Sequence, residues 1–129
     1  MKNLSTAIYT KYNTSTTFKA ALTGGFYYSQ APNGCSYPYA VYSFFGVTPE
    51  DTFSEEINDV SIQINIYSEK SSSTECFNLV DYCKSLFTGA VLTVLTHENV
   101  TLIKEMETPP MKVNDEWMGV LEFSCFLQE

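Results

Sequence analysis

The chain has 129 residues, 44% of them hydrophobic, and its fifteen acidic residues outnumber its seven basic ones to give a net charge of −8. This length and apolar content suffice for one folded core and argue against a disordered chain. The negative charge argues against a protein that wraps a nucleic-acid backbone, because such proteins need clustered lysine and arginine. We therefore expect a single domain over residues 1–129.

No apolar run in the sequence approaches the length of about 20 residues that crosses a bilayer. The first residues also show no apolar segment of signal-peptide length. We therefore expect a soluble chain that is made in a cytosol and has no membrane partner.

Residues 2–22 are predicted to form two short helices. Apolar residues recur at helical spacing, and the polar run 13–16 interrupts them with side chains that compete for backbone hydrogen bonds. Ser15 or Thr16 is placed to cap the second helix. The glycine pair at 24–25 is placed to end it, since glycine tolerates the left-handed conformation of helix ends.

Two aromatic segments follow the helices. Residues 26–29 and 39–45 are rich in aromatic and β-branched residues, which favours strands. The loop between them contains Asn33 and Gly34, a pair typical of turns. We expect Pro38 at the first residue of the second strand or at a sheet edge, because proline cannot donate to a strand ladder.

The clearest pattern in the chain lies within residues 58–87. Apolar and polar side chains alternate over residues 60–67, which predicts a strand with one buried face, and the period then changes to that of a helix. Ser72 and Glu75 have the spacing of a capping box, and Gly89 is placed to end the helix. The predicted core residues are Val60, Ile62, Ile64 and Ile66 on the strand and Cys76, Leu79, Val80, Cys83, Leu86 and Phe87 on the helix.

Further strands are predicted near the C-terminus, at residues 90–94, 100–106 and 117–127, whereas residues 108–116 break the pattern and predict a loop. The last strand would bury Leu121, Phe123, Cys125 and Leu127. An amphipathic strand that leads into an amphipathic helix indicates a sheet with helices packed on one face. The sequence therefore predicts an α+β fold.

Few residues are candidates for chemistry. The only histidine, His97, lies next to Glu98 in a turn-like segment, where a surface turn is favoured over acid–base catalysis. Cys76 and Cys83 are about 10.5 Å apart along one predicted helix, too far for a disulfide. No cysteine pair has the spacing of a zinc site, and no phosphate-loop or calcium-loop motif is present. We expect no enzyme activity, cofactor or metal, and buried reduced thiols at Cys35, Cys76, Cys83 and Cys125.

Residues 46–56 are predicted to be irregular, and they carry four acidic residues and no basic one. The simpler interpretation is a solvated hairpin loop, because charge-rich loops usually are. The alternative is a projecting arm that touches a partner or lines an opening.

Four short features stand out in this order of elements: Ala31 with Pro32, the tripeptide at 37–39, the strand-to-helix junction at 68–72 and the closing strand at 119–123. Together they resemble the tail-completion, or tail-terminator, family of long-tailed bacteriophages and related gene-transfer particles. The resemblance spans nearly the whole chain. It implies a mostly antiparallel β-sheet with two or three helices against one face.

The resemblance also implies a role in the virion. Copies would form a ring, commonly a hexamer, at the head-proximal end of the tail tube, where the ring stops tube growth and joins the tail to the head connector. Its partners would be itself, the tail tube protein and a head-completion protein, with DNA passing through the lumen without specific binding. The place of action would be the tail or neck of the virion, assembled in the cytoplasm of a bacterial host.

A closed ring repeats one heterologous contact, so each subunit needs two complementary patches. Residues 46–56 and 108–116 are the irregular stretches available to supply them, and acids facing the lumen would let DNA slide without adhering. The candidate interface or lumen residues are Glu50, Asp51, Phe53, Glu55, Glu56, Pro109, Pro110, Met111, Asp115 and Glu116.

Two other functions stay open. One is another phage neck or tube protein, such as a head-completion ring or a tube subunit, because fold alone does not settle function. The other is a small binding or inhibitory module, or an enzyme whose site is not recognisable, which a deep pocket holding a perturbed acid would favour.

Overall fold

The computed structural model describes residues 2–51, 56–69, 71–94 and 99–128. In the described residues the helices are α1 (Lys2–Thr14), α2 (Thr16–Ala21) and α3 (Thr74–Phe87). The strands are β1 (Gly25–Tyr28), β2 (Tyr39–Asp51), β3 (Glu56–Ser68), β4 (Val91–Thr93), β5 (Asn99–Thr101), β6 (Ile103–Val113) and β7 (Glu116–Gln128). None of the described helices is both long and apolar enough to cross a membrane.

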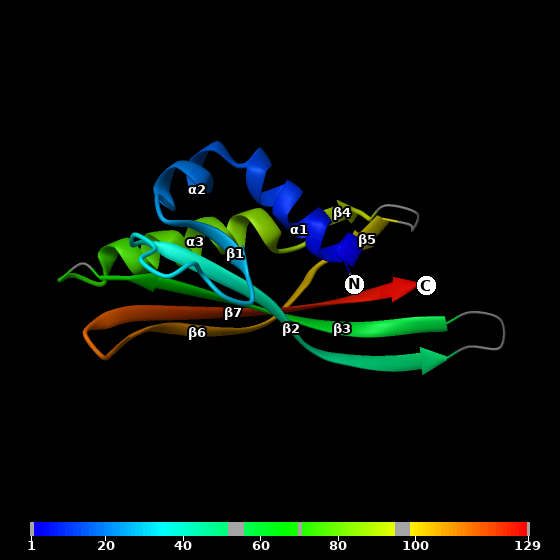
Figure 1. Cartoon of the computed structure of the whole chain (residues 1–129). Coiled ribbons are helices and arrows are strands. Elements are labelled where there is room, and N and C mark those ends of the chain that lie inside the picture. Colours follow the sequence, from blue (N-terminus) through cyan, green and yellow to red (C-terminus); the bar gives the residue numbers. More distant parts are fainter. Residues whose placement is uncertain (1, 52–55, 70, 95–98, 129) are drawn as a thin grey trace.

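Five strands form one sheet in the order β1-β2-β3-β7-β6, and β4 and β5 form a separate two-stranded ribbon. Only β1 and β2 pair in parallel among the described strand pairs; the others are antiparallel. The three helices lie on one side of the sheet, as Figure 1 shows. The predicted α+β fold, with a mostly antiparallel sheet and helices on one face, is confirmed.

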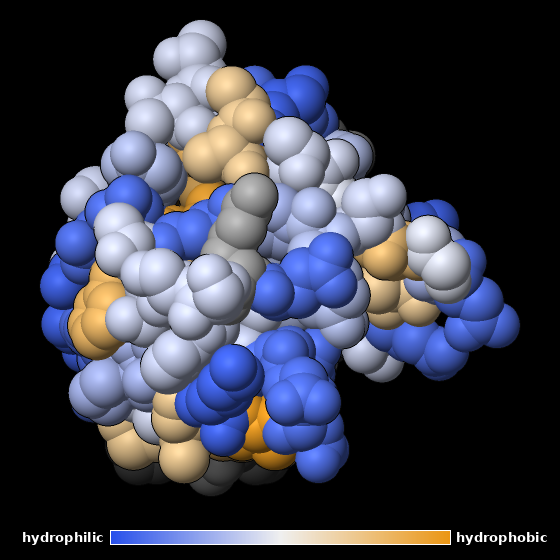
Figure 2. All heavy atoms as spheres, turned by 90° about the vertical axis from the view of Figure 1, so that its left-hand side faces the viewer, coloured by the Kyte–Doolittle hydropathy of each residue, from blue (hydrophilic) through white to orange (hydrophobic). Residues whose placement is uncertain are grey.

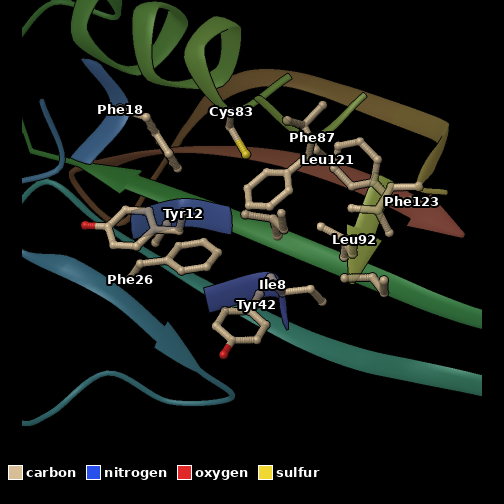
Figure 3. Close-up of a cluster of buried hydrophobic side chains, with 14 of the residues drawn as sticks. Ile8, Tyr12, Phe18, Phe26, Tyr42, Cys83, Phe87, Leu92, Leu121 and Phe123 are labelled. Atoms are coloured by element: carbon tan, nitrogen blue, oxygen red, sulfur yellow. The ribbon is translucent and has the colours of Figure 1, made fainter. Parts of the chain in front are cut away.

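The core lies between the helices and the sheet, and it follows the two periodicities read from the sequence. Every second side chain of β3 from Val60 to Ile66 is buried, and so is the predicted stripe of α3 except Leu86, which is half-buried against the core. Phe26 of β1 stacks between Tyr12 of α1 and Tyr42 of β2, with ring centroids 4.7 Å from each (Figure 3). Such aromatic pairs add about 0.5–1.5 kcal/mol each beyond simple burial.

The helix ends agree with the sequence in part. The Phe18 N–H donates to Ser15 Oγ over 3.0 Å, so Ser15 caps α2 as predicted. Gly89 follows α3 with a φ of +70°, the left-handed conformation expected there. The capping box of α3 was wrong, because the N-cap is Ser73 and Glu75 instead accepts a hydrogen bond from the buried Ser68 hydroxyl.

The prediction of an irregular stretch was wrong for residues 46–51 and for residue 56, which lie in β2 and β3, whereas residues 52–55 lie outside the described residues. The register of β2 and β3 shifts between Phe44 and Gly46, and pairing then continues to Asp51 opposite Glu56. Past Tyr42 no described strand lies on the other side of β2, so a sheet-edge position accommodates Pro49. Cross-strand pairing therefore overrides the local signals of glycine, proline and acidic residues.

Residues 108–116 were wrongly predicted to be a loop. β6 continues to Val113, and a two-residue turn at Asn114 and Asp115 leads into β7 at Glu116. Both turn residues have positive φ, 52° and 64°, as two-residue hairpin turns require and Asn and Asp tolerate. The two prolines fall where the register shifts between Thr108 and Met111, on the edge strand of the sheet.

The predicted strand at 100–106 is divided into β5 and β6. Leu102 lies between them, its N–H donates to the carbonyl of Ala90 over 2.9 Å, and its side chain is buried. This contact bends the chain, so that β5 pairs with β4 and β6 joins the main sheet.

Candidate functional site

The candidate interface residues lie at opposite ends of the main sheet (Figure 1). β3 and β7 pair from Ile57 opposite Gln128 at one end to Ser68 opposite Trp117 at the other. Glu50 and Asp51 end β2 and Glu56 begins β3, at the first of these ends. The remaining candidates of that stretch, Phe53 and Glu55, lie outside the described residues. The structure therefore does not bring the two candidate stretches together.

The β2–β3 hairpin extends further than its neighbours at one end of the sheet. β6 pairs with β7 only as far as Ile103 opposite Ser124, whereas β2 and β3 continue their pairing to Asp51 opposite Glu56. β1 stops opposite Tyr42. The end of this hairpin, with the end of β7 beside it, forms an arm on the right of Figure 1.

The second candidate stretch is the β6–β7 hairpin, where Asp115 is exposed in the turn. Glu116 has a protein partner, because the Tyr37 hydroxyl donates to its Oε2 over 2.5 Å. This hydrogen bond makes the largest contribution to raising the pKa of Tyr37 to about 12. Met111 is half-exposed on β6. Figure 2 looks at the left-hand side of the view in Figure 1, and hydrophilic residues dominate that surface.

The sheet face opposite the helices is covered by no described helix (Figure 1). Its centre is polar, because the Gln63 amide donates to the Glu122 carboxylate over 3.2 Å. Apolar side chains on the same face include Met106 and Phe126, which are about half-exposed. The alternation over residues 60–67 predicted only the buried face of the strand, and this opposite face was not among the predicted sites. The sequence pattern that could have predicted a partly apolar outer face is that residues 118–126 are largely apolar on both faces of the strand.

A cleft of about 460 Å³ opens between this sheet face and the loop that joins β1 to β2. The loop residues 29–35 form one wall, and side chains of β2 and β3 form the floor. Tyr39 and Tyr67 stack there with ring centroids 5.0 Å apart and planes at 27°. No sequence pattern predicted this cleft, because its two walls meet only when β1, β2 and β3 join one sheet.

The four cysteines are free thiols, and three of them are buried as predicted. Burial is the main reason why the pKa values of Cys76 and Cys125 rise to about 11. Burial also raises the pKa of Cys83. These thiols are therefore neutral at physiological pH and poor nucleophiles. The prediction was wrong for Cys35, which is half-exposed in the cleft and whose Sγ lies 3.2 Å from the Gly24 carbonyl.

No group of three or more His, Cys, Asp or Glu residues is placed to hold a metal ion within the described part of the chain. His97, the one candidate for acid–base chemistry, lies outside the described residues.

The chain matches the family model described as tail completion protein gp17 over residues 6–106. It is similar in structure to a chain from the virion of a native gene transfer agent (GTA) particle, with 15% identity, a TM-score of 0.79, and coverage of 98% of this chain and 95% of that one. A second solved chain is 12% identical, with a TM-score of 0.69 and coverage of 99% and 95%. At these identities the two structures show a shared fold. No curated protein matches the chain in sequence.

Proposed function

Because the chain belongs to the tail completion protein gp17 family, we propose that six copies of it close into a ring at the head-proximal end of a phage tail tube. The ring ends the growth of the tube and presents a surface to the head connector. The family match over residues 6–106 is the observation that carries this proposal.

The placement of the two hairpins supports the proposal. A ring in the neck must contact the tail on one side and the head on the other, and each subunit must also contact two neighbours through different patches. The end of the β2–β3 arm and the β6–β7 turn lie at opposite ends of the sheet, so one subunit can reach two neighbours at once. The remaining candidate residues, Pro109, Pro110 and Met111, line the β6 edge between these ends.

The acidic residues of the arm fit a position at the lumen. Glu50, Asp51, Glu55 and Glu56, four of the fifteen acidic residues of the chain, would place negative charge on the inner surface of the ring. Negative charge repels the DNA backbone, so DNA slides through without adhering. The specific partners in this proposal are the tail tube protein, the head-completion protein and further copies of the chain.

Assembly with purified components tests the proposal. The chain is mixed with preformed tail tubes of the same particle, fresh tube subunits are added, and tube lengths are measured by electron microscopy. We expect one ring at one tube end and no further growth from that end. Growth equal to that of tubes without the chain would contradict termination. Continuous polymers of the chain itself would identify a tube subunit instead.

A further inference from the structure

The loop that walls the cleft is anchored by contacts around Gly24, the residue that precedes β1. The Gly24 N–H donates to the Pro38 carbonyl over 2.7 Å, and the Tyr27 hydroxyl donates to the Gly24 carbonyl over 2.5 Å. A Cβ on Gly24 would lie only 1.7 Å from the carbonyl oxygen of Ser36, so the loop packs directly on this glycine. The cleft is therefore preformed, which lowers the cost of binding.

Tyrosine rings form one side of the cleft. Tyr39 stacks on Tyr67, and the ring of Tyr37 lies 5.3 Å from that of Tyr39. Burial is the main reason why the pKa of Tyr39 is raised. The hydrogen bond to Glu116 is the main reason why the pKa of Tyr37 rises to about 12. The phenols of Tyr37 and Tyr39 are therefore neutral at physiological pH, and the faces of neutral tyrosine rings attract cations.

The charges around the cleft favour a cationic ligand. The carboxylates of Glu116 and Glu69 are close enough to raise the pKa of Tyr37 by their charge. Among the described residues that line the cleft, none is a lysine. Asn65 is one of the residues that line the cleft, and its buried Oδ1 has no donor among the described residues, so an acceptor next to the cleft lacks a hydrogen-bond partner.

We propose that this cleft binds the guanidinium group of an arginine from a different virion protein. Arginine fits better than lysine because its planar, weakly hydrated group stacks on tyrosine and offers five donors. All seven basic residues of this chain are lysines, so a second copy cannot supply the group. The identity of the partner as a neighbouring virion protein rests on the proposed function, whereas arginine binding does not.

The test uses the full-length chain labelled with ¹⁵N and followed by NMR. N-acetyl-L-arginine methylamide is titrated as the probe, with the citrulline analogue as the neutral isostere and the lysine analogue as the alternative cation. We expect saturable shifts at residues 29–43 and 63–67 for arginine, weaker binding for lysine and none for citrulline. Equal binding of citrulline, or of lysine, would overturn the proposal.

Two variants locate the binding. Tyr39→Leu should weaken arginine binding about fivefold, the loss expected for one cation–π contact. Tyr82→Leu, which removes a tyrosine from the exposed side of α3, is the matched control and should bind as the unaltered chain does. If Tyr39→Leu does not fold, Glu116→Gln tests the arginine binding instead. This variant removes the negative charge near the cleft, keeps a hydrogen-bond acceptor for Tyr37, and should weaken arginine binding. Unchanged affinity in a folded Tyr39→Leu chain, or in Glu116→Gln, would overturn the proposal.

The two proposals fail separately. A chain that caps tubes but binds no arginine probe overturns the cleft assignment and leaves the terminator role intact. A chain that binds the probe at the cleft but neither forms rings nor caps tubes overturns the terminator role alone.

Discussion

Gly119 of β7 lies directly beneath Val80 of α3, and a Cβ added to Gly119 would come within 2.5 Å of Val80 Cγ2. The absence of a side chain at this position lets the helix approach the sheet. Because this packing joins α3 to an interior strand of the sheet, it helps to fix the layer from which both hairpins project.

Gly119→Ala should lower the free energy of unfolding by about 1–3 kcal/mol, the cost of overpacking a core. Urea denaturation measures this change. Combining it with Val80→Ala should cost less than the sum of the two single changes, because the smaller residue makes room for the new methyl group. Strict additivity would mean that the two residues do not meet.

Ser68→Ala should lower the free energy of unfolding by about 1–2 kcal/mol, because the change removes the hydrogen bond of 2.6 Å that the buried Ser68 hydroxyl donates to the half-buried Glu75. Ser72→Ala is the control, since the hydrogen bond that it removes is exposed. A capping box at Ser72 would reverse this order. Thermal or urea denaturation of both variants decides between the two arrangements.

Ile64→Ala should cost about 2–5 kcal/mol in a urea denaturation experiment, because Ile64 is fully buried against the helices. Gln63→Ala should cost much less, since Gln63 lies on the uncovered face and loses one partly exposed hydrogen bond. Equal losses in the two variants would show that the assignment of the strand faces is wrong.

The Tyr37–Glu116 hydrogen bond should make stability depend on alkaline pH. The pKa of Tyr37 rises from 10.0 to about 12 in the folded chain, so the stabilisation is fully present below pH 10 and is lost as the pH rises towards 12. Tyr37→Phe should lose less stability than the unaltered chain over this interval. An identical pH profile for the two chains, measured by urea denaturation, would contradict this.

Changing Glu50, Asp51, Glu55 and Glu56 together to lysine should reduce DNA delivery, because positive charge in the lumen would hold the phosphate backbone. Changing the same four residues to Gln or Asn is the matched control and should have a smaller effect. DNA delivery is measured by counting productive particles, and ring assembly by electron microscopy. If the lysine variant changes neither, the lumen assignment loses its support.

The sequence alone predicted those helices and strands that bury one face against the core, because their apolar residues recur with the period of the element. The alternation around Ile64 and the helical stripe around Cys83 each describe one element against one core, and both were predicted correctly. The cap at Ser15 is equally local, because its hydrogen bond to Phe18 spans three residues.

The hairpin ends could not be predicted because their structure depends on pairing with a distant strand. Local residues around Pro49 and Pro110 favour loops, but backbone pairing along the sheet keeps both segments extended. The cleft depends on the same long-range order. Tyr39 and Tyr67 are 28 positions apart and meet only through the register of β2 and β3.

Electron microscopy of particles made without this chain tests the central claim most directly. The account predicts filled heads beside detached tails, some of them longer than normal, and normal particles again when the chain is supplied from a plasmid. Joined heads and tails of normal length in the absence of the chain would contradict the terminator role.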